Sequence, residues 1–290
     1  MGRHIALVVN PTSGRGLGAR ITPVVRARLE SAGLTVSEFA STCAADVGRI
    51  SSEVMASGAD AVALIGGDGT IHLAVQVLAN SGMPFGVIPA GTGNDFARSI
   101  GVPMKDPVAA ADLIVAGTTR AVDVATAKDE FITTVLAGGF DSLVNKRANA
   151  MSWPKGNARY TLATLAELRT FKPLSYVITV DGEVFETDAM LVAVGTSPSY
   201  GGGLQICAGA LIDDGLLDVT IIRPVSRLTL LQMFPKLSKG THVGHPMVWA
   251  LRGRSVRLES PGVTAYADGE ILGPLPVDIG IAPGALTVFA

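Results

Sequence analysis

Cysteine and charged residues are both scarce in this 290-residue sequence, and their scarcity narrows the class of protein. The two cysteines, Cys43 and Cys207, lie far apart in no metal-ligand spacing, which favours a reduced, cytoplasmic protein without a disulfide framework. A formal net charge of −2 offers no overall basic field for nucleic acid. Apolar segments are too short for a signal peptide or a membrane span, so any work at a membrane is expected from its surface.

Apolar residues are abundant, at 48%, and the chain is long enough for two domains with a sizeable core. Up to about Val124, strand-like and helix-like segments alternate, which is typical of an open, mostly parallel sheet covered on both faces. Strand-like runs separated by Asp-Gly turns predominate after that point. We therefore expect an α/β domain over residues 1–124 and a β-rich domain over residues 125–290.

The individual elements follow from the same patterns. In the first domain the predicted strands are 5–9, 35–39, 61–65 and 85–88, and the predicted helices are 20–32, 47–56, 71–78, 96–99 and 107–116. In the second domain the predicted strands are 131–137, 176–180, 190–195, 217–222, 255–259, 263–267 and 286–289, with helices at 158–170 and around 228–237.

A glycine-rich loop with one carboxylate follows the third predicted strand. The loop Gly66-Gly67-Asp68-Gly69-Thr70 separates an apolar run from a helix-like segment that begins at Ile71. Glycines let the backbone approach a bound group closely, and N–H groups can converge on an anion at the start of a helix. Asp68 would repel a bare phosphate, but a divalent cation can bridge the two. The loop therefore indicates a magnesium–nucleotide site, although its residues also suit an ordinary turn.

Two further loops of similar composition follow the first and fourth predicted strands. They are Asn10-Pro11-Thr12-Ser13-Gly14 and Gly91-Thr92-Gly93-Asn94-Asp95. Because ligands bind at the carboxyl ends of the strands in open α/β sheets, we expect all three loops to line one crevice. The segment from Gly14 to Ala19 also matches a dinucleotide fingerprint, with Glu38 at a plausible distance for a ribose contact. That interpretation leaves the other two loops unexplained.

The ordered set of loops, together with a late Asp268-Gly269-Glu270, resembles the soluble bacterial diacylglycerol kinase family, which also takes in sphingosine kinases. The resemblance covers nearly the whole chain. It implies an amino-terminal α/β domain like that of phosphofructokinase and NAD kinase, then a β-sandwich domain whose last strands return toward the first. It also implies ATP and Mg²⁺ as cofactors, and transfer of the γ-phosphate to a hydroxyl of a diacylglycerol-like lipid.

Positions that match the family's motifs are implied to bind the nucleotide. Asp68 would act through Mg²⁺, Arg15 and Arg20 could neutralise phosphate charge, and either Ser41 or Thr42 could contact the nucleotide. The complete implied set is Asn10, Pro11, Thr12, Ser13, Gly14, Arg15, Arg20, Ser41, Thr42, Gly66, Gly67, Asp68, Gly69, Thr70, Gly91, Thr92, Gly93, Asn94 and Asp95.

Asp268 and Glu270 match the family's catalytic pair. A lipid hydroxyl must lose its proton as it attacks the γ-phosphorus, and a carboxylate can accept that proton. The sequence does not rank the two acids. Asp-Gly is also a common hairpin turn, and Asp181-Gly182-Glu183 repeats the tripeptide at what we expect to be a surface turn.

A second metal site is implied near the middle of the second domain. By the resemblance, the Asp214 carboxylate and the backbone carbonyls of Leu211 and Leu216 would bind Mg²⁺ away from the chemistry. An ordinary turn before a strand explains these residues equally well. The stretch from Gly201 to Gly203 matches a family glycine segment and could flank the lipid entrance.

The resemblance implies a lipid alcohol as substrate and reversible association with a membrane surface, and it leaves the identity of the lipid and a homodimer open. The stretch 227–237 mixes basic and apolar residues and could rest on a membrane, although a helix packed on the sandwich is the commoner case. Two alternative functions remain. One is NAD kinase, which shares the Gly-Gly-Asp-Gly-Thr loop, and the other is a nucleotide-sensing protein without turnover.

Overall fold

The computed structural model describes residues 3–139 and 172–290, together with single residues at 144, 147, 150, 151, 153, 162, 163 and 166. Strands and helices alternate in its first part. They are β1 (His4–Val9), α1 (Ser13–Ser31), β2 (Thr35–Ala40), α2 (Ala44–Ala56), β3 (Ala61–Gly66), α3 (Asp68–Leu78), β4 (Pro84–Pro89), α4 (Asp95–Ser99) and α5 (Pro107–Ala116).

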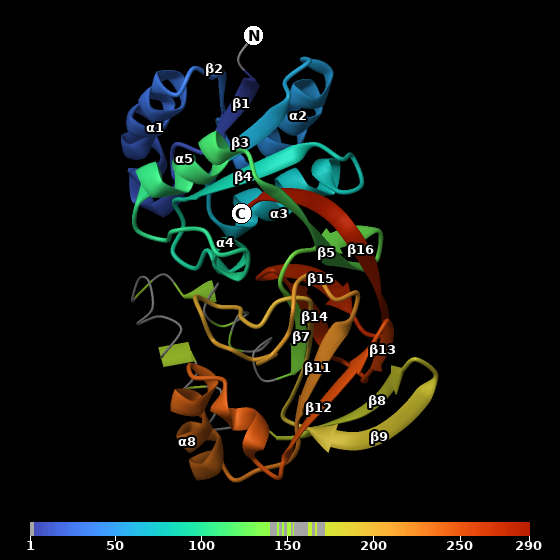
Figure 1. Ribbon diagram of the computed structural model, residues 1–290. Helices are drawn as coiled ribbons and strands as arrows, with labels where there is room; N and C mark the ends of the chain where they lie inside the picture. The colour runs from blue at the N-terminus through green and yellow to red at the C-terminus, as the bar shows by residue number, and fades with distance from the viewer. Residues whose placement is uncertain are drawn as a thin grey trace.

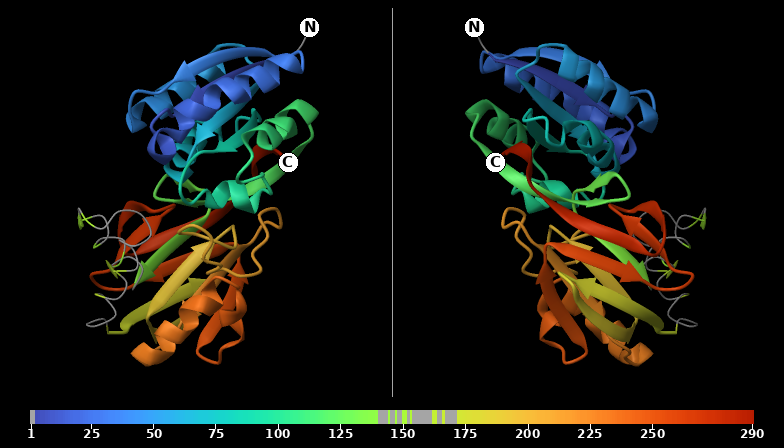
Figure 2. Two further views of the ribbon diagram at one scale, coloured as in Figure 1. Left: turned by 90° about the vertical axis from the view of Figure 1, so that its left-hand side faces the viewer. Right: turned by 90° about the vertical axis from the view of Figure 1, so that its right-hand side faces the viewer.

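The first four strands form a parallel sheet in the order β2-β1-β3-β4. Strand β3 is buried at every position, as a continuous apolar run predicts for a strand covered on both faces. Helix α1 packs on α5 and α2 packs on α3, and Figure 1 shows these pairs on opposite sides of the sheet. The carboxyl ends of the strands point toward the second part of the chain (Figure 2).

The second part is built mainly of strands. They are β5 (Thr119–Ala127), β6 (Glu130–Ile132), β7 (Val135–Gly139), β8 (Leu174–Val180), β9 (Glu183–Ala189), β10 (Leu191–Gly195), β11 (Leu217–Ile222), β12 (Val248–Gly253), β13 (Ser255–Glu259), β14 (Thr264–Ala267), β15 (Glu270–Pro274) and β16 (Val277–Phe289). The described helices among them are α8 (Arg227–Leu237) and a short 3₁₀ turn, η1 (Thr241–Gly244).

These strands form a sandwich of two sheets. One sheet has the order β12-β11-β10-β7-β14-β15, and the other continues from the parallel sheet through β16, β13, β8 and β9. Side chains alternate between its layers: in β10, Val192 and Val194 enter the core between the sheets, whereas Leu191 and Ala193 pack on the side of α8. The expected fold class, an α/β domain followed by a β-sandwich domain, is therefore confirmed.

The last strand, β16, belongs to both parts of the molecule. Its end at Thr287 and Val288 runs parallel to β4, and its beginning pairs with β13. Strand β5 runs antiparallel to β16, with an irregularity between Ala282 and Leu286. The Asp123 side chain on β5 connects this irregular segment to the turn before β11. Its Oδ1 accepts the N–H of Gly284 and its Oδ2 accepts the N–H of Gly215, both at 2.7 Å.

The structure corrects several predicted elements. The predicted strand 131–137 is split into β6 and β7, because the N–H groups of Thr133 and Thr134 turn toward Asp268. The strand predicted at 286–289 is only the end of β16, and the helix predicted from residue 71 already begins at Asp68. The helix predicted at 20–32 lies in α1, whose first turn is non-helical at 14–16. Apart from single positions, the predicted helix 158–170 lies outside the described residues.

We expect Asp123→Asn to destabilise the protein by about 1–3 kcal/mol, because an amide would turn a donor toward one of the two N–H groups and leave it buried without an acceptor. Urea unfolding followed by circular dichroism measures the change. Asp278→Asn is the matched control, since the Asp278 side chain is 76% exposed and pairs with Arg257 at the surface. We expect the control to change stability by less than about 1 kcal/mol. Equal stability of the two variants would contradict this role for Asp123.

Candidate active site

The three glycine-rich loops meet at the carboxyl ends of β1, β3 and β4. A Cβ atom on Gly14 would lie 2.1 Å from the carbonyl oxygen of Ala90, and one on Gly67 would lie 2.9 Å from the Cα atom of Gly91. Gly14 also has a φ of +58°, which a larger residue adopts only with strain. Glycine is therefore required for the loops to approach each other this closely.

Two asparagines hold the loops in place. Asn10 Nδ2 donates to Thr70 Oγ1 at 2.9 Å and joins the first loop to the second, while Asn10 Oδ1 accepts the hydroxyl and N–H of Thr12. The Asn94 side chain closes the third loop on itself through the N–H and carbonyl of Gly91, at 2.8 and 2.9 Å. The side-chain amides therefore fix the backbone that the sequence predicts to surround phosphates.

A crevice of about 540 Å³ opens beside the loops, a size that suits a small-molecule ligand. Its lining comes from both parts of the chain and combines the predicted loop residues with the predicted catalytic Glu270. The lining residues are Asn10, Ser13, Val47, Gly67, Gly69, Thr70, His72, Leu73, Glu130, Glu270 and Ile271.

The remaining predicted nucleotide residues, including the whole third loop, are not among the residues that line this crevice. Arg15, Arg20 and Thr92 are exposed. The Ser41 hydroxyl is buried and donates to a backbone carbonyl in β1, whereas the Thr42 hydroxyl bonds to a carboxylate of α2. The hydroxyls of both residues therefore have partners within the protein.

Two carboxylates lie side by side next to Gly93. A Cβ atom there would be 2.7 Å from Asp68 Oδ2 and 3.3 Å from Asp95 Oδ2. Burial, together with the charge of Asp95, raises the pKa of Asp68 to about 6, although Oδ1 accepts the N–H of Phe96 at 3.3 Å. A divalent cation relieves this kind of uncompensated negative charge with oxygen ligands. Asp68 therefore fits Mg²⁺ as the side chain that would hold it.

Asp95 also connects the third loop to the second domain. Its Oδ1 accepts the N–H of Gly203 at 2.7 Å and the hydroxyl of Ser199 at 3.1 Å, and its Oδ2 accepts the N–H of Gly202 at 2.7 Å. The glycine stretch that the resemblance places near the lipid entrance is thus anchored beside the paired carboxylates.

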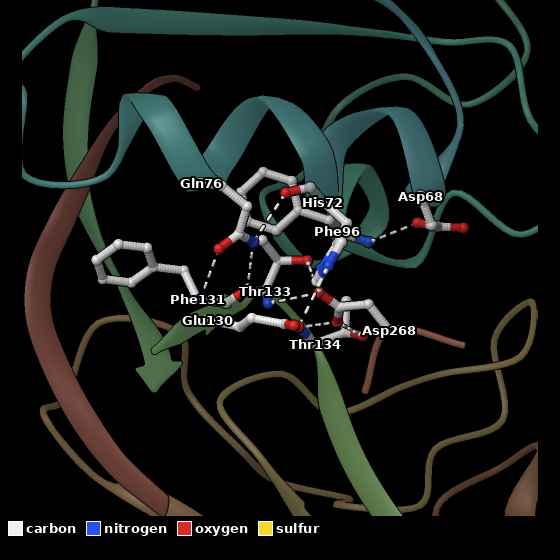
Figure 3. Close-up of polar contacts among 9 residues, drawn as sticks. All are labelled: Asp68, His72, Gln76, Phe96, Glu130, Phe131, Thr133, Thr134 and Asp268. Carbon is white, nitrogen blue, oxygen red and sulfur yellow. Dashed lines mark hydrogen bonds and ion pairs between the residues drawn. The ribbon is translucent and has the colours of Figure 1, made fainter. Parts of the chain in front are cut away.

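The Asp268 side chain is fully buried between the two domains (Figure 3). Its Oδ2 accepts the N–H and hydroxyl of Thr133 at 2.9 and 3.0 Å, and its Oδ1 accepts those of Thr134 at 2.8 and 2.7 Å. His72 Nδ1 lies 3.1 Å from Oδ2. Burial raises the pKa of Asp268, but the hydrogen bonds from His72, Thr133 and Thr134 outweigh it and leave this pKa below its usual value. Asp268 is therefore a firmly ionised carboxylate.

His72 and Glu130 belong to this site and were missed in the sequence. His72 Nε2 lies 3.8 Å from Glu130 Oε2, and Glu270 Oε1 is 3.8 Å from where a Cβ of Gly69 would be. The hydrogen bond to Asp268 raises the pKa of His72 against the effect of burial. A spacing of four residues places His72 on the same helix face as Asp68, and that signal was available.

The predicted second metal site contains an ion pair. Asp214 Oδ2 bonds to the Arg252 guanidinium, whose Nε also donates to Asp218 Oδ1 at 3.1 Å. Asp214 Oδ1 accepts the N–H of Leu216 at 3.1 Å, and Leu211 is 56% exposed. Arg252 thus lies against the carboxylate that the resemblance assigns to a cation, and the metal site at Asp214 stays a prediction.

We expect Asp68→Asn to stabilise the metal-free protein at pH 7. Because the folded pKa of about 6 exceeds the usual aspartate pKa of 3.8, the carboxyl group favours the folded state below about pH 3.8, and this contribution is lost as the pH rises through 6. The shift corresponds to at most about 3 kcal/mol, which partial exposure reduces to about 2 kcal/mol. Urea unfolding between pH 4 and 8 should show the gain growing with pH.

The same titrations with added Mg²⁺ provide the control. Mg²⁺ should stabilise the wild-type protein and leave Asp68→Asn unchanged, since the variant lacks one of the paired carboxylates. Identical stability of both proteins at pH 7, with the same response to Mg²⁺, would show that Asp68 is neither strained nor a cation ligand.

Comparisons with known proteins agree with this geometry. The diacylglycerol kinase catalytic domain matches residues 4–127, and the YegS C-terminal NAD kinase beta sandwich-like domain matches residues 134–290. A diacylglycerol kinase of Mycobacterium tuberculosis is 44% identical over 291 residues, which cover 98% of this chain and 94% of that protein. A diacylglycerol kinase of Bacillus subtilis is 29% identical over 278 residues, covering 94% and 92%.

Among solved structures, a putative diacylglycerol kinase from Bacillus anthracis superposes with a TM-score of 0.83 at 25% identity, over 99% of this chain and 95% of that one. The similarity is thus continuous through both domains. The chain belongs to the bacterial diacylglycerol kinase family, a family of lipid kinases.

Proposed function

We propose that this protein transfers the γ-phosphate of ATP to a free hydroxyl of diacylglycerol or a closely similar lipid, with Mg²⁺ as cofactor. The observation that carries the proposal is one crevice lined by residues of the first two glycine-rich loops together with His72 and Glu270. The third loop packs against the second at Gly67, and His72 contacts the buried Asp268. The relatives that are named diacylglycerol kinases support the choice of lipid.

The loops of the first domain would bind the nucleotide. Their N–H groups at the start of α3 suit phosphate oxygens, and the exposed Arg15 and Arg20 could add positive charge beside the first loop. Asp68 would hold Mg²⁺, which would supply positive charge to offset the phosphate charge that this carboxylate otherwise repels. A second Mg²⁺ would be held away from the chemistry by the Asp214 carboxylate and the backbone carbonyls of Leu211 and Leu216, with Arg252 beside that carboxylate.

The second domain would supply the groups that act on the lipid hydroxyl. The hydroxyl oxygen attacks phosphorus and loses its proton, so an ionised group must stand near it. We propose that one of two carboxylates, the buried Asp268 or Glu270 exposed at the crevice, accepts this proton and that the other orients it. Both acids follow β14 and face α3, whose first turn belongs to the phosphate loop.

Access to the lipid would be from the membrane surface. None of the helices in the described ranges has the length and apolar character that a membrane crossing demands. Helix α8 buries Leu230, Met233 and Leu237 against the sandwich. The apolar residues Leu228 and Leu231 of α8 are exposed, as are its basic residues Arg227 and Lys236. Lys239, which follows the helix, is also exposed. An apolar and basic surface of this kind favours reversible binding to anionic lipids.

Sedimentation with vesicles tests the membrane proposal. We expect binding to phosphatidylglycerol vesicles that weakens with salt, because screening removes the attraction of Lys236 and Lys239. Changing both lysines to glutamine should weaken binding, whereas the same change at the surface residue Lys105 should not. Binding that neither salt nor the double substitution alters would contradict docking through α8.

Turnover with ATP and diacylglycerol in mixed micelles tests the activity. We expect Asp268→Asn to lower turnover by about 10²–10⁴-fold with little change in ATP affinity, since Asp268 serves the hydroxyl and not the nucleotide. Glu270→Gln should also lower turnover. Asp181→Asn is the matched control, because Asp181 occupies the same tripeptide in the surface turn between β8 and β9.

Three outcomes would contradict the activity or its assignment. Phosphorylation of NAD and of no lipid would favour NAD kinase, and ATP binding without turnover would favour a nucleotide sensor. Wild-type rates in both Asp268→Asn and Glu270→Gln would show that Asp268-Gly269-Glu270 is only a hairpin turn without a catalytic role.

A further inference from the structure

The half-buried side chain of Gln76 joins α3 to β6, across the boundary between the two domains (Figure 3). Its Oε1 accepts the N–H of Phe131 at 2.9 Å. Its Nε2 donates to the carbonyl oxygens of Phe131 and His72, at 2.8 and 2.9 Å. A glutamine amide offers an acceptor oxygen and two donor hydrogens, and each has a partner here. These partners fix the amide in a single orientation.

The Gln76 amide takes the place of a neighbouring strand for β6. This strand has only three residues and pairs with β5 along one edge. At its middle residue, Phe131, both the N–H and the carbonyl bond to Gln76. A two-stranded hairpin is only marginally stable when it stands alone, and backbone polar groups away from water need partners. The amide therefore fixes the position of the hairpin of β5 and β6 against α3.

On its own helix, Gln76 lies in line with the phosphate loop. Asp68, His72 and Gln76 follow one another at intervals of four residues, which places them along one side of α3. The first turn of this helix belongs to the Gly-Gly-Asp-Gly-Thr loop. A shift of β6 along α3 is therefore also a shift relative to the groups that would bind phosphate.

On the other side of the connection, β6 leads to the catalytic acids of the second domain. Glu130 lines the crevice and directly precedes Phe131. Two residues after Phe131, the N–H groups of Thr133 and Thr134 donate to Asp268 at 2.9 and 2.8 Å. The position of this buried carboxylate therefore depends on where β6 lies.

We propose that Gln76 is a positioning residue for phosphoryl transfer, which sets the distance between the phosphate loop and the acids of the second domain. The inference rests on the proposed lipid kinase function, and it holds whichever of Asp268 and Glu270 accepts the proton. Reacting atoms must approach to about 3–3.5 Å, and a misplacement of about 1 Å can cost roughly 100-fold in rate. Gln76 does not line the crevice, so it acts through the groups that it aligns.

The first experiment compares Gln76→Met with the wild-type protein, using ATP, saturating Mg²⁺ and diacylglycerol in mixed micelles. Methionine has a side chain of similar length but leaves three backbone groups without their partner. We expect kcat to fall by roughly 10–100-fold. The KM for ATP, and the number of ATP sites measured by calorimetry, should stay the same because the nucleotide loops are untouched.

Arg3→Met is the matched control for a general loss of stability. Arg3 Nη2 donates to the carbonyl oxygens of Ile114 and Val115 at 2.9 and 3.0 Å. It precedes β1, at the amino ends of the parallel strands and away from the crevice. Both variants thus lose a side chain that donates to two backbone carbonyls. We expect the urea midpoint to fall in both, and kcat to fall in Gln76→Met alone.

The second experiment changes Gln76 to glutamate and measures kcat relative to the wild type between about pH 4.5 and 8, a range that begins near the usual glutamate pKa. A protonated carboxyl group can accept the Phe131 N–H and donate to one carbonyl, whereas an ionised one faces two carbonyl oxygens without a donor. The ratio of variant to wild-type kcat should therefore fall about tenfold as the pH rises. In Gln76→Met the same ratio should not change with pH.

The charged groups around the new carboxyl group are few. Glu130 on β6 and burial favour its protonated form, and His72 on α3, with Asp268 beyond it, favours the ionised form only when the imidazole is charged. On the packed helix α2, the side chains of Asp46, Arg49 and Glu53 pair with one another. Gln76→Glu keeps the test decisive if Gln76→Met does not fold, because at low pH it restores most of the hydrogen bonds.

The outcomes separate the inference from the function on which it rests. A wild-type protein that phosphorylates no lipid overturns the proposed function and this inference together. If the wild-type protein does phosphorylate lipid, a folded Gln76→Met variant with the same kcat overturns the inference alone. An equal fall of kcat in Arg3→Met, or a ratio independent of pH in Gln76→Glu, overturns it as well.

Discussion

The burial of the Asp268 carboxylate is the constraint on which the site depends. An ion in the interior must be surrounded by donors, and here they come from both domains: His72 on α3, and Thr133 and Thr134 between β6 and β7. Meeting that requirement interrupts a run that would otherwise form one strand and brings α3 against the sandwich. The crevice lies where these elements converge, with the phosphate loop at the start of the same helix.

The two central carboxylates show how surroundings assign different chemistry to one residue type. Burial and the neighbouring charge of Asp95 raise the pKa of Asp68, so this carboxyl resists ionisation and suits a cation. Asp268 is supplied with donors on both oxygens, so it stays ionised. Asp181 begins a second copy of the tripeptide that begins at Asp268. It has a similar positive φ and also accepts backbone N–H groups, yet it lies at the surface. Position in the fold, and not the motif alone, separates them.

The sequence predicts the fold class and the three loops because both depend on local patterns: alternating apolar periodicity, and glycines next to strand ends. It does not predict the pair of His72 with Asp268, which are 196 residues apart, or that of Asp214 with Arg252, because such partners meet only after folding. The length of β16 was missed for the same reason, since it pairs with strands from both domains. Asp123 was detectable, as a single acid in the apolar run Val122-Asp123-Val124.

Strand β16 has a mechanical consequence. It is hydrogen-bonded to β4 at one end and to β13 at the other, with β5 alongside it. A hinge rotation that widened the crevice would have to bend the ribbon of β5 and β16 or break its backbone hydrogen bonds. The irregular segment of β16 is held by the hydrogen bond from the Gly284 N–H to Asp123. These pairings therefore oppose a change in the width of the crevice between the two domains.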